Sequence, residues 1–217
     1  MTDNFTDFKR EFEQPTKEHQ EREKNQKKHL EFLGKSQNCC VCLVDIVGST
    51  NLVSNIPESK TSFFYSTFLN EMAEVVDDNN GKIVKSIGDA LLFYFQDSEE
   101  GYLKNALNCG LEMVEKRQAI NKKLLEKDIP KISYRVSSDF GKVMVGYSSV
   151  SVVENIFGAT VNMCSKINPL ANNNSMVIGN DFYNVAKMLG NFEFKEIKNN
   201  PRIGLDNKYP VFQVQRS

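Results

Sequence analysis

The segment GKIVKSIGDALLFYF, Gly81–Phe95, contains two runs rich in β-branched and aromatic residues, at 82–87 and 90–95. Gly88 and Asp89 separate the two runs, and both residue types tolerate the left-handed backbone that a tight turn requires. The segment therefore predicts a β-hairpin that carries Asp89 in its turn.

Regular patterns flank this hairpin on both sides. The expected elements, in chain order, are a strand at 39–45, a helix from Pro57 to 79, the hairpin, a helix at 99–127, a strand pair within 132–145 around Gly141, a helix from Thr160 to Pro169, a strand at 176–178, a helix at 181–189 and strands at 192–197 and 210–215. The order strand, helix, hairpin, helix, strand predicts an α+β plait. Its ferredoxin-like βαββαβ core would have one antiparallel sheet, helices packed on one face and additional C-terminal strands.

The composition is that of one globular domain with an extension. The chain has 217 residues, of which 40% are hydrophobic, and 27 Lys plus Arg nearly balance 28 Asp plus Glu. We expect a polar, helical N-terminal extension at 1–37 and a single domain at 38–217. The balanced charge argues against a nucleic-acid partner. The apolar runs are too short for a membrane span and the N-terminus does not resemble a signal peptide, which predicts a cytoplasmic protein.

The histidines limit the possible chemistry. His19 and His29 both lie in the extension, so residues 38–217 contain none. This excludes Ser-His-Asp and Cys-His hydrolysis and histidine-based zinc sites within the domain. The cysteines of the run CCVC, at 39–42, lie in an expected strand and are interpreted as small buried hydrophobic residues. Chemistry in this domain must therefore depend on carboxylates, lysines, amides or a bound metal.

Two aspartates are expected to converge. The run CLVDIVGST, Cys42–Thr50, ends a buried strand on Asp45, and the plait places that strand end beside the hairpin turn with Asp89. Two close carboxylates repel each other unless a cation lies between them, and hard oxygen ligands suit Mg²⁺ or Mn²⁺. The alternative is that Asp45 caps the following helix while Asp89 only occupies a turn.

Three motifs in this order resemble one family. VDIVGST at 44–50, GKIVKSIGDALLFYF at 81–95 and ENIFGATVNMCSKI at 154–167 are similar to motifs of class III nucleotidyl cyclase catalytic domains, the adenylate and guanylate cyclases. The resemblance extends over roughly residues 38–215. A rival family, the dinucleotide-forming cyclases of the GGDEF plait, is disfavoured because the hairpin turn reads SIGDA.

The resemblance implies roles for the residues of the first motifs. Asp45 and Asp89 match the metal-binding aspartates, and the carbonyl of Ile46 would also bind metal. The loop Val47–Thr50, which comprises Val47, Gly48, Ser49 and Thr50, matches the turn whose amides bind the triphosphate. Lys85 matches a lysine that reads the purine in adenylate cyclases, whereas guanylate cyclases usually carry Glu there.

The resemblance also assigns residues after the hairpin. Asn155 falls at the second purine-reading position, and Asn162 matches the asparagine that orients the ribose. Lys166 replaces the usual transition-state arginine, so a point charge takes the place of a planar fork of donors and the activity could be slow. Lys198 is a candidate for the lysine that binds the terminal phosphates.

The resemblance implies an adenylate cyclase. It would convert ATP to 3′,5′-cyclic AMP and pyrophosphate with two Mg²⁺ or Mn²⁺ ions per site. Because one domain carries both halves of the family's two-domain site, the resemblance also implies a homodimer with composite sites. Two alternatives remain, namely a catalytically weak or inactive cyclase-like dimerisation or nucleotide-binding domain, and a guanylate cyclase with GTP as substrate.

Overall fold

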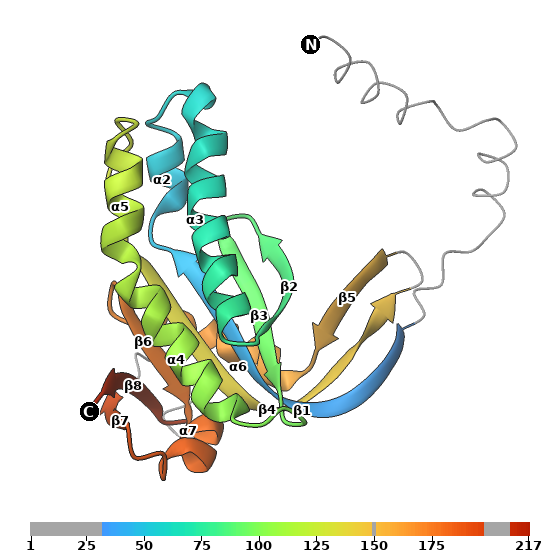
Figure 1. Ribbon diagram of the computed structural model, residues 1–217. Helices are drawn as coiled ribbons and strands as arrows, with labels where there is room; N and C mark the ends of the chain where they lie inside the picture. Colours follow the sequence, from blue (N-terminus) through green and yellow to red (C-terminus); the bar gives the residue numbers. More distant parts are fainter. Residues whose placement is uncertain (1–31, 149–150, 198–208) are drawn as a thin grey trace, which may run out of the picture.

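The computed structural model describes residues 32–148, 151–197 and 209–217 (Figure 1). The elements in these ranges are β1 (Phe32–Ile46), α2 (Ser49–Val53), α3 (Glu58–Asp78), β2 (Lys82–Ile87), β3 (Ala90–Gln96), α4 (Tyr102–Glu115), α5 (Arg117–Leu125), β4 (Tyr134–Ser148), β5 (Ser151–Phe157), α6 (Ala159–Ile167), a 3-10 turn (Asn168–Leu170), β6 (Ser175–Gly179), α7 (Asn180–Ala186), β7 (Phe192–Ile197) and β8 (Val211–Arg216). None of the helices in these ranges combines the length and apolar character needed to cross a membrane.

The strands form one sheet in the order β2-β3-β1-β4-β6-β8-β7, with β5 paired to β4. The first four strands give the ferredoxin-like core, and their pairs β1–β3, β1–β4 and β2–β3 are all antiparallel. The predicted fold class is confirmed, including the additional C-terminal strands β7 and β8. The complete sheet is mixed, because β4 and β6 run parallel.

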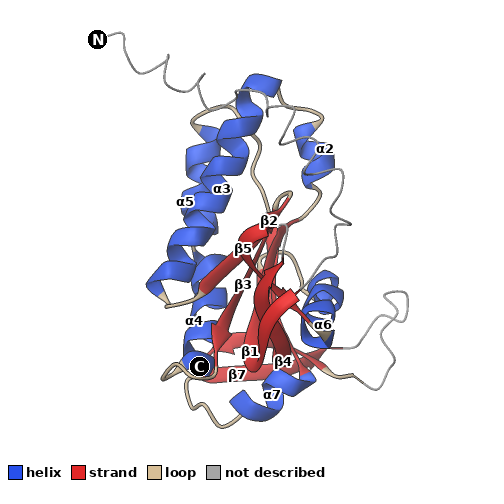
Figure 2. Ribbon diagram, turned by 90° about the vertical axis from the view of Figure 1, so that its right-hand side faces the viewer, coloured by secondary structure: helices blue, strands red, loops and turns tan. Residues whose placement is uncertain are grey.

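β1 is buried on both faces because its side chains alternate between two apolar layers. Cys40, Cys42 and Val44 belong to the core cluster under α3, α4 and α5, whereas Val41 and Leu43 belong to a second cluster on the opposite face. α6 covers that second face with Cys164 and other buried residues. Figure 2 shows α3, α4 and α5 on one side of the sheet and α6 on the other.

The structure corrects the predicted boundaries of two elements. β1 begins at Phe32, so residues 32–37, which were expected in the polar extension, lie in the first strand. The rest of that extension, with its predicted helix, falls outside the described residues. The single helix predicted at 99–127 is two helices, α4 and α5, separated at Lys116.

The predicted strand pair around Gly141 was wrong. Residues 134–148 form one continuous strand, β4, and its partner β5 was not predicted. The glycine serves close packing: a Cβ on Gly141 would lie 2.6 Å from Oγ1 of Thr160 at the start of α6. A glycine that permits a helix to approach a sheet was therefore misinterpreted as a turn.

Candidate active site

Asp45 and Asp89 lie close together, as predicted. Asp45 is the penultimate residue of β1, and Asp89 follows Gly88, whose φ of 63° makes the tight β2–β3 turn. Antiparallel pairing of β1 with β3 ends at Val44 and Leu91, which brings the strand end beside the turn. Burial and the charge of Asp89 both raise the pKa of Asp45.

This carboxylate pair has the chemistry of a divalent-cation site. The charge of Asp89 makes Asp45 harder to ionise, and a bound cation would remove that penalty. Within the described ranges, no cluster of three or more His, Cys, Asp or Glu side chains is placed to hold a metal ion. Any further ligands would have to be backbone carbonyls such as that of Ile46, water or substrate oxygens, a ligand set that suits Mg²⁺.

The loop after Asp45 is only partly available to a phosphate. Gly48 has a left-handed φ of 70°, and Ser49, which is buried, begins α2. The amide of Val47 already donates a 2.8 Å hydrogen bond to the carbonyl of Ser133. Val47 belongs to the loop that was expected to bind the triphosphate, but its backbone amide is already hydrogen-bonded within the protein.

The structure joins the two residues that were expected to read the base. Lys85 on β2 donates a 2.9 Å hydrogen bond from Nζ to Oδ1 of Asn155 on β5. A lysine ammonium can only donate, so the oxygen of the amide must face it. Both side chains remain accessible to a ligand, with Lys85 exposed and Asn155 half-buried.

Asn162 and Lys166 lie one turn apart on α6, and both are exposed. The helix is fixed by its buried face, which includes Thr160 and Ile167. Among the described residues, no hydrogen bond or ion pair links Asn162 or Lys166 to the aspartate pair or to Lys85. Lys198 lies outside the described residues.

Arg135 is a site residue that the sequence reasoning missed. It lies on β4 directly opposite Asp45, and its charge lowers the pKa of that aspartate. Its Nε is buried and makes no hydrogen bond to any described residue. A buried guanidinium donor without a partner is costly, and an anionic ligand would satisfy it. The only signal in the sequence was one arginine within an otherwise uncharged strand segment, SYRVSS.

Asp139 is a second buried carboxyl group, on the same strand but outside this site. Tyr209 donates a 2.6 Å hydrogen bond to its Oδ2, and the backbone amide of Phe140 donates one of 2.9 Å to its Oδ1. Burial raises the pKa of Asp139 to about 6 despite these hydrogen bonds. The folded protein therefore holds a proton here that the unfolded chain releases at lower pH.

This proton predicts a pH-dependent stability. Because the folded state binds more protons than the unfolded state between about pH 4 and pH 6, the free energy of unfolding should fall across this window, by up to roughly 3 kcal/mol from Asp139. Asp139→Asn should remove that fall, measured by urea unfolding across the window. The exposed Asp77→Asn is the control and should leave the slope unchanged. An Asp139→Asn protein with the parental slope would refute the assignment.

Comparisons with known proteins agree with this architecture. Residues 33–208 match the family described as the adenylate and guanylate cyclase catalytic domain. A curated relative from Staphylococcus aureus, named cytidylate cyclase, is 24% identical over 195 residues, which cover 83% of this chain and 46% of the relative. The chain thus spans less than half the length of that relative.

Solved structures show the same fold. The adenylyl cyclase CyaB from P. aeruginosa superposes with a TM-score of 0.76 and 21% identity, covering 85% of this chain and 97% of that one. The guanylate cyclase domain of RhGC from Catenaria anguillulae, solved in complex with GTP, superposes with a TM-score of 0.73 and 19% identity. The match covers 84% of this chain and 98% of that one.

Proposed function

Because this chain belongs to the family of adenylate and guanylate cyclase catalytic domains, we propose that it converts ATP to 3′,5′-cyclic AMP and pyrophosphate at a homodimer interface. The observation that supports an amino-substituted base is the hydrogen bond between Lys85 and Asn155, and the choice of adenine rests on the match of Lys85 to the purine-reading lysine of adenylate cyclases. The observation that supports turnover is the close pair Asp45 and Asp89, because a binding domain without catalysis has no need for two repelling carboxylates.

The base-reading pair is complementary to an amino-substituted base. Lys85 presents only donors, while Oδ1 of Asn155 has a second lone pair beyond the one that Lys85 occupies. Adenine offers a ring-nitrogen acceptor beside an exocyclic amino donor, which fits this donor and acceptor. Guanine and uracil offer a carbonyl acceptor beside a ring N–H donor at the same edge, so they present the acceptor and the donor in the reverse order.

The phosphate end would be held by the remaining site residues. Asp45, Asp89 and the carbonyl of Ile46 would bind Mg²⁺ or Mn²⁺, which when bound activates the ribose 3′-hydroxyl and neutralises the departing pyrophosphate. Arg135 would donate its free Nε–H to the phosphates. In this proposal Asn162 orients the ribose and Lys166 supplies positive charge near the reacting phosphorus.

Exposed apolar side chains support a homodimer. Ile83 and Ile87 on β2, either side of Lys85, are 45% and 53% exposed, and Met144 on β4 is 43% exposed. Large exposed apolar residues around a polar site are typical of a surface that a protein partner covers. A second copy of the chain would bury them and bring its own aspartate pair towards Lys85.

A second candidate substrate is CTP. Cytosine also presents a ring-nitrogen acceptor beside an amino donor, so the Lys85–Asn155 pair suits it as well as adenine. The Staphylococcus aureus relative is named cytidylate cyclase. The choice between ATP and CTP would then depend on the space available to a one-ring or a two-ring base.

The test is incubation of the purified chain with each of the four nucleoside triphosphates and Mg²⁺ or Mn²⁺, with chromatographic identification of the products. Cyclic AMP as the main product is the expected result, and cyclic CMP would favour the second candidate. Preferential cyclisation of GTP or UTP would contradict the assigned order of contacts, in which Lys85 donates to the ring nitrogen and Asn155 accepts from the amino group. No cyclic product from a protein shown to be dimeric would favour a regulatory, non-catalytic domain.

Arg135 provides a separate prediction. Replacing Arg135 with Ala should lower kcat/KM for the triphosphate about a hundredfold, because a buried donor to the phosphates is lost. Folding should be little affected, since its Nε has no partner among the described residues. Lys142→Ala, an exposed position on the same strand, is the control. Unchanged kcat/KM in Arg135→Ala would exclude this residue from the site.

A further inference from the structure

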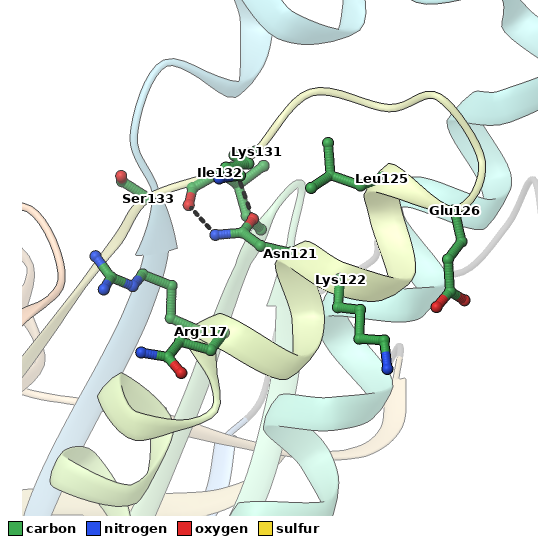
Figure 3. A pocket seen from close by; sticks show the side chains of 9 residues that line it. Arg117, Asn121, Lys122, Leu125, Glu126, Lys131, Ile132 and Ser133 are labelled. Carbon is green, nitrogen blue, oxygen red and sulfur yellow. Dashed lines mark hydrogen bonds between the residues drawn. The ribbon is translucent and has the colours of Figure 1, made fainter.

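A cavity of about 790 Å³ lies beside α5, away from the proposed active site. Arg117, Lys122 and Leu125 of α5 line it together with Lys131 and Ile132 from the segment that leads into β4. The volume lies within the range of small-molecule sites in proteins. Figure 3 shows these residues around the end of α5 and the chain that returns from it.

The charge of the lining favours an anion. The lining contains three cationic side chains, Arg117, Lys122 and Lys131, and one carboxylate, Glu126. None of the three cations forms a salt bridge with a residue of the described ranges. By contrast, Lys116 and Lys123, their neighbours in sequence, both pair with Glu71. The cations that line the cavity are therefore free to bind a ligand.

The cavity also offers an apolar surface. Leu125 is 48% exposed, and Ile132 forms a buried wall. A ligand with an apolar body could rest on these side chains while its anionic group contacts the cations. The planar guanidinium of Arg117 suits a phosphate or a carboxylate, which it can bind through two parallel hydrogen bonds.

The cavity and the side chain of Asp45 lie on opposite faces of the sheet. Ile132 belongs to the core cluster under α3, α4 and α5, which also contains Val44. Side chains alternate along β1, so Asp45 points to the opposite face from Val44. A ligand in the cavity and a nucleotide beside Asp45 could thus be bound at the same time.

A short chain of hydrogen bonds connects the cavity to the loop after Asp45. The side-chain amide of Asn121 on α5 makes two hydrogen bonds to the backbone of Ile132, as Figure 3 shows. Its Oδ1 accepts from the N–H of Ile132 at 2.7 Å, and its Nδ2 donates to the carbonyl of Ile132 at 3.1 Å. The next carbonyl, that of Ser133, accepts from the amide of Val47 at 2.8 Å. These contacts join α5, the 131–133 segment and Val47 in one continuous chain of hydrogen bonds.

We propose that this cavity is an effector site for a small organic anion, a phosphate monoester or a carboxylate, whose binding is coupled to the loop Val47–Thr50. Only the effect on turnover rests on the proposed cyclase activity, since binding and its transmission to Val47 can be measured without turnover. Coupling of this kind is reciprocal, so a nucleotide at the active site changes the affinity of the effector by the same factor.

The test uses the full chain labelled with ¹⁵N and titrated with phenyl phosphate or benzoate, in the presence of a chelator that removes divalent metal. Saturable shifts of the amide resonances of Leu125, Ile132 and Val47 are expected with at least one of the two probes, and comparison of the probes shows whether the site prefers phosphate or carboxylate. No saturable shift at Leu125 and Ile132 with either probe would overturn the site. Shifts there that leave Val47 unmoved would overturn the coupling.

Two variants with opposite expected effects on the affinity for the probe make the test specific. Lys131→Gln should weaken the binding of the probe about tenfold, because a charge-assisted contact is lost. Glu126→Gln should tighten it, because a repelling carboxylate is removed. Both positions are exposed, so folding should be preserved, and Lys104→Gln on α4 serves as the control. Equal affinities in all three variants would show that the anion binds elsewhere.

The effect on activity separates this proposal from the proposed function. If the chain is an active cyclase, the probe should change kcat in the parent protein and not in a Lys122→Gln/Lys131→Gln variant, whose basal rate should be unaltered. A change in kcat that persists in this variant would place the anion at the active site and overturn the proposal. An inactive chain that still shows saturable shifts at Leu125, Ile132 and Val47 would refute the proposed function and support the effector site.

Discussion

Replacing Asp45 or Asp89 with Ala is expected to lower turnover at least about a thousandfold, because either change removes half of the carboxylate pair that would hold the metal ions. The fold should survive both changes. Burial and the neighbouring charge raise the pKa of Asp45, so the ionised side chain destabilises the folded protein. A neutral residue at this position removes that destabilisation.

The measurement is the initial rate of cyclic nucleotide formation at saturating metal and substrate, with thermal unfolding as the check on the fold. Asp97→Ala is the matched control, because this aspartate is exposed just after the far end of β3. Substantial activity in Asp45→Ala or Asp89→Ala would show that the pair does not bind the catalytic metal.

Mixing two inactive variants should restore activity if the site is shared between protomers. In the proposed homodimer, Asp45 of one chain and Lys85 of the other serve the same cleft, so Asp45→Ala and Lys85→Ala should each be nearly inactive. A mixed dimer has one cleft with both residues intact and one with both lesions. Random pairing makes about half of the dimers mixed, so recovery should approach roughly a quarter of the parental rate.

Subunit exchange must be shown in the same samples, for example by two affinity tags that co-purify only from mixed dimers. The matched control is a mixture of Asp45→Ala with Asp89→Ala, which should remain inactive because both residues belong to the same half of the site. If exchange occurs and the Asp45→Ala and Lys85→Ala mixture stays inactive, then both residues act within one chain or Lys85 lies outside the site.

The sequence alone was sufficient for features that depend on local periodicity. The hairpin with Asp89 in its turn and the core-facing helix α3 were predicted nearly to the residue, because alternation and helical spacing report burial directly. The convergence of Asp45 and Asp89 also followed from sequence, because the plait topology places the end of the first strand beside the hairpin turn. Their roles as metal ligands stay a prediction.

Only the tertiary structure could determine features that depend on contacts between distant segments. The register of β1 against β4 places Arg135 opposite Asp45, and no local pattern encodes that register. The hydrogen bond between Lys85 and Asn155 joins β2 to β5, a strand that the sequence did not predict. Gly141 was interpreted as a turn because a glycine in a sequence can indicate either a turn or close packing of a helix. Only the position of Thr160, whose Oγ1 leaves no room for a Cβ on Gly141, shows that the glycine permits close packing.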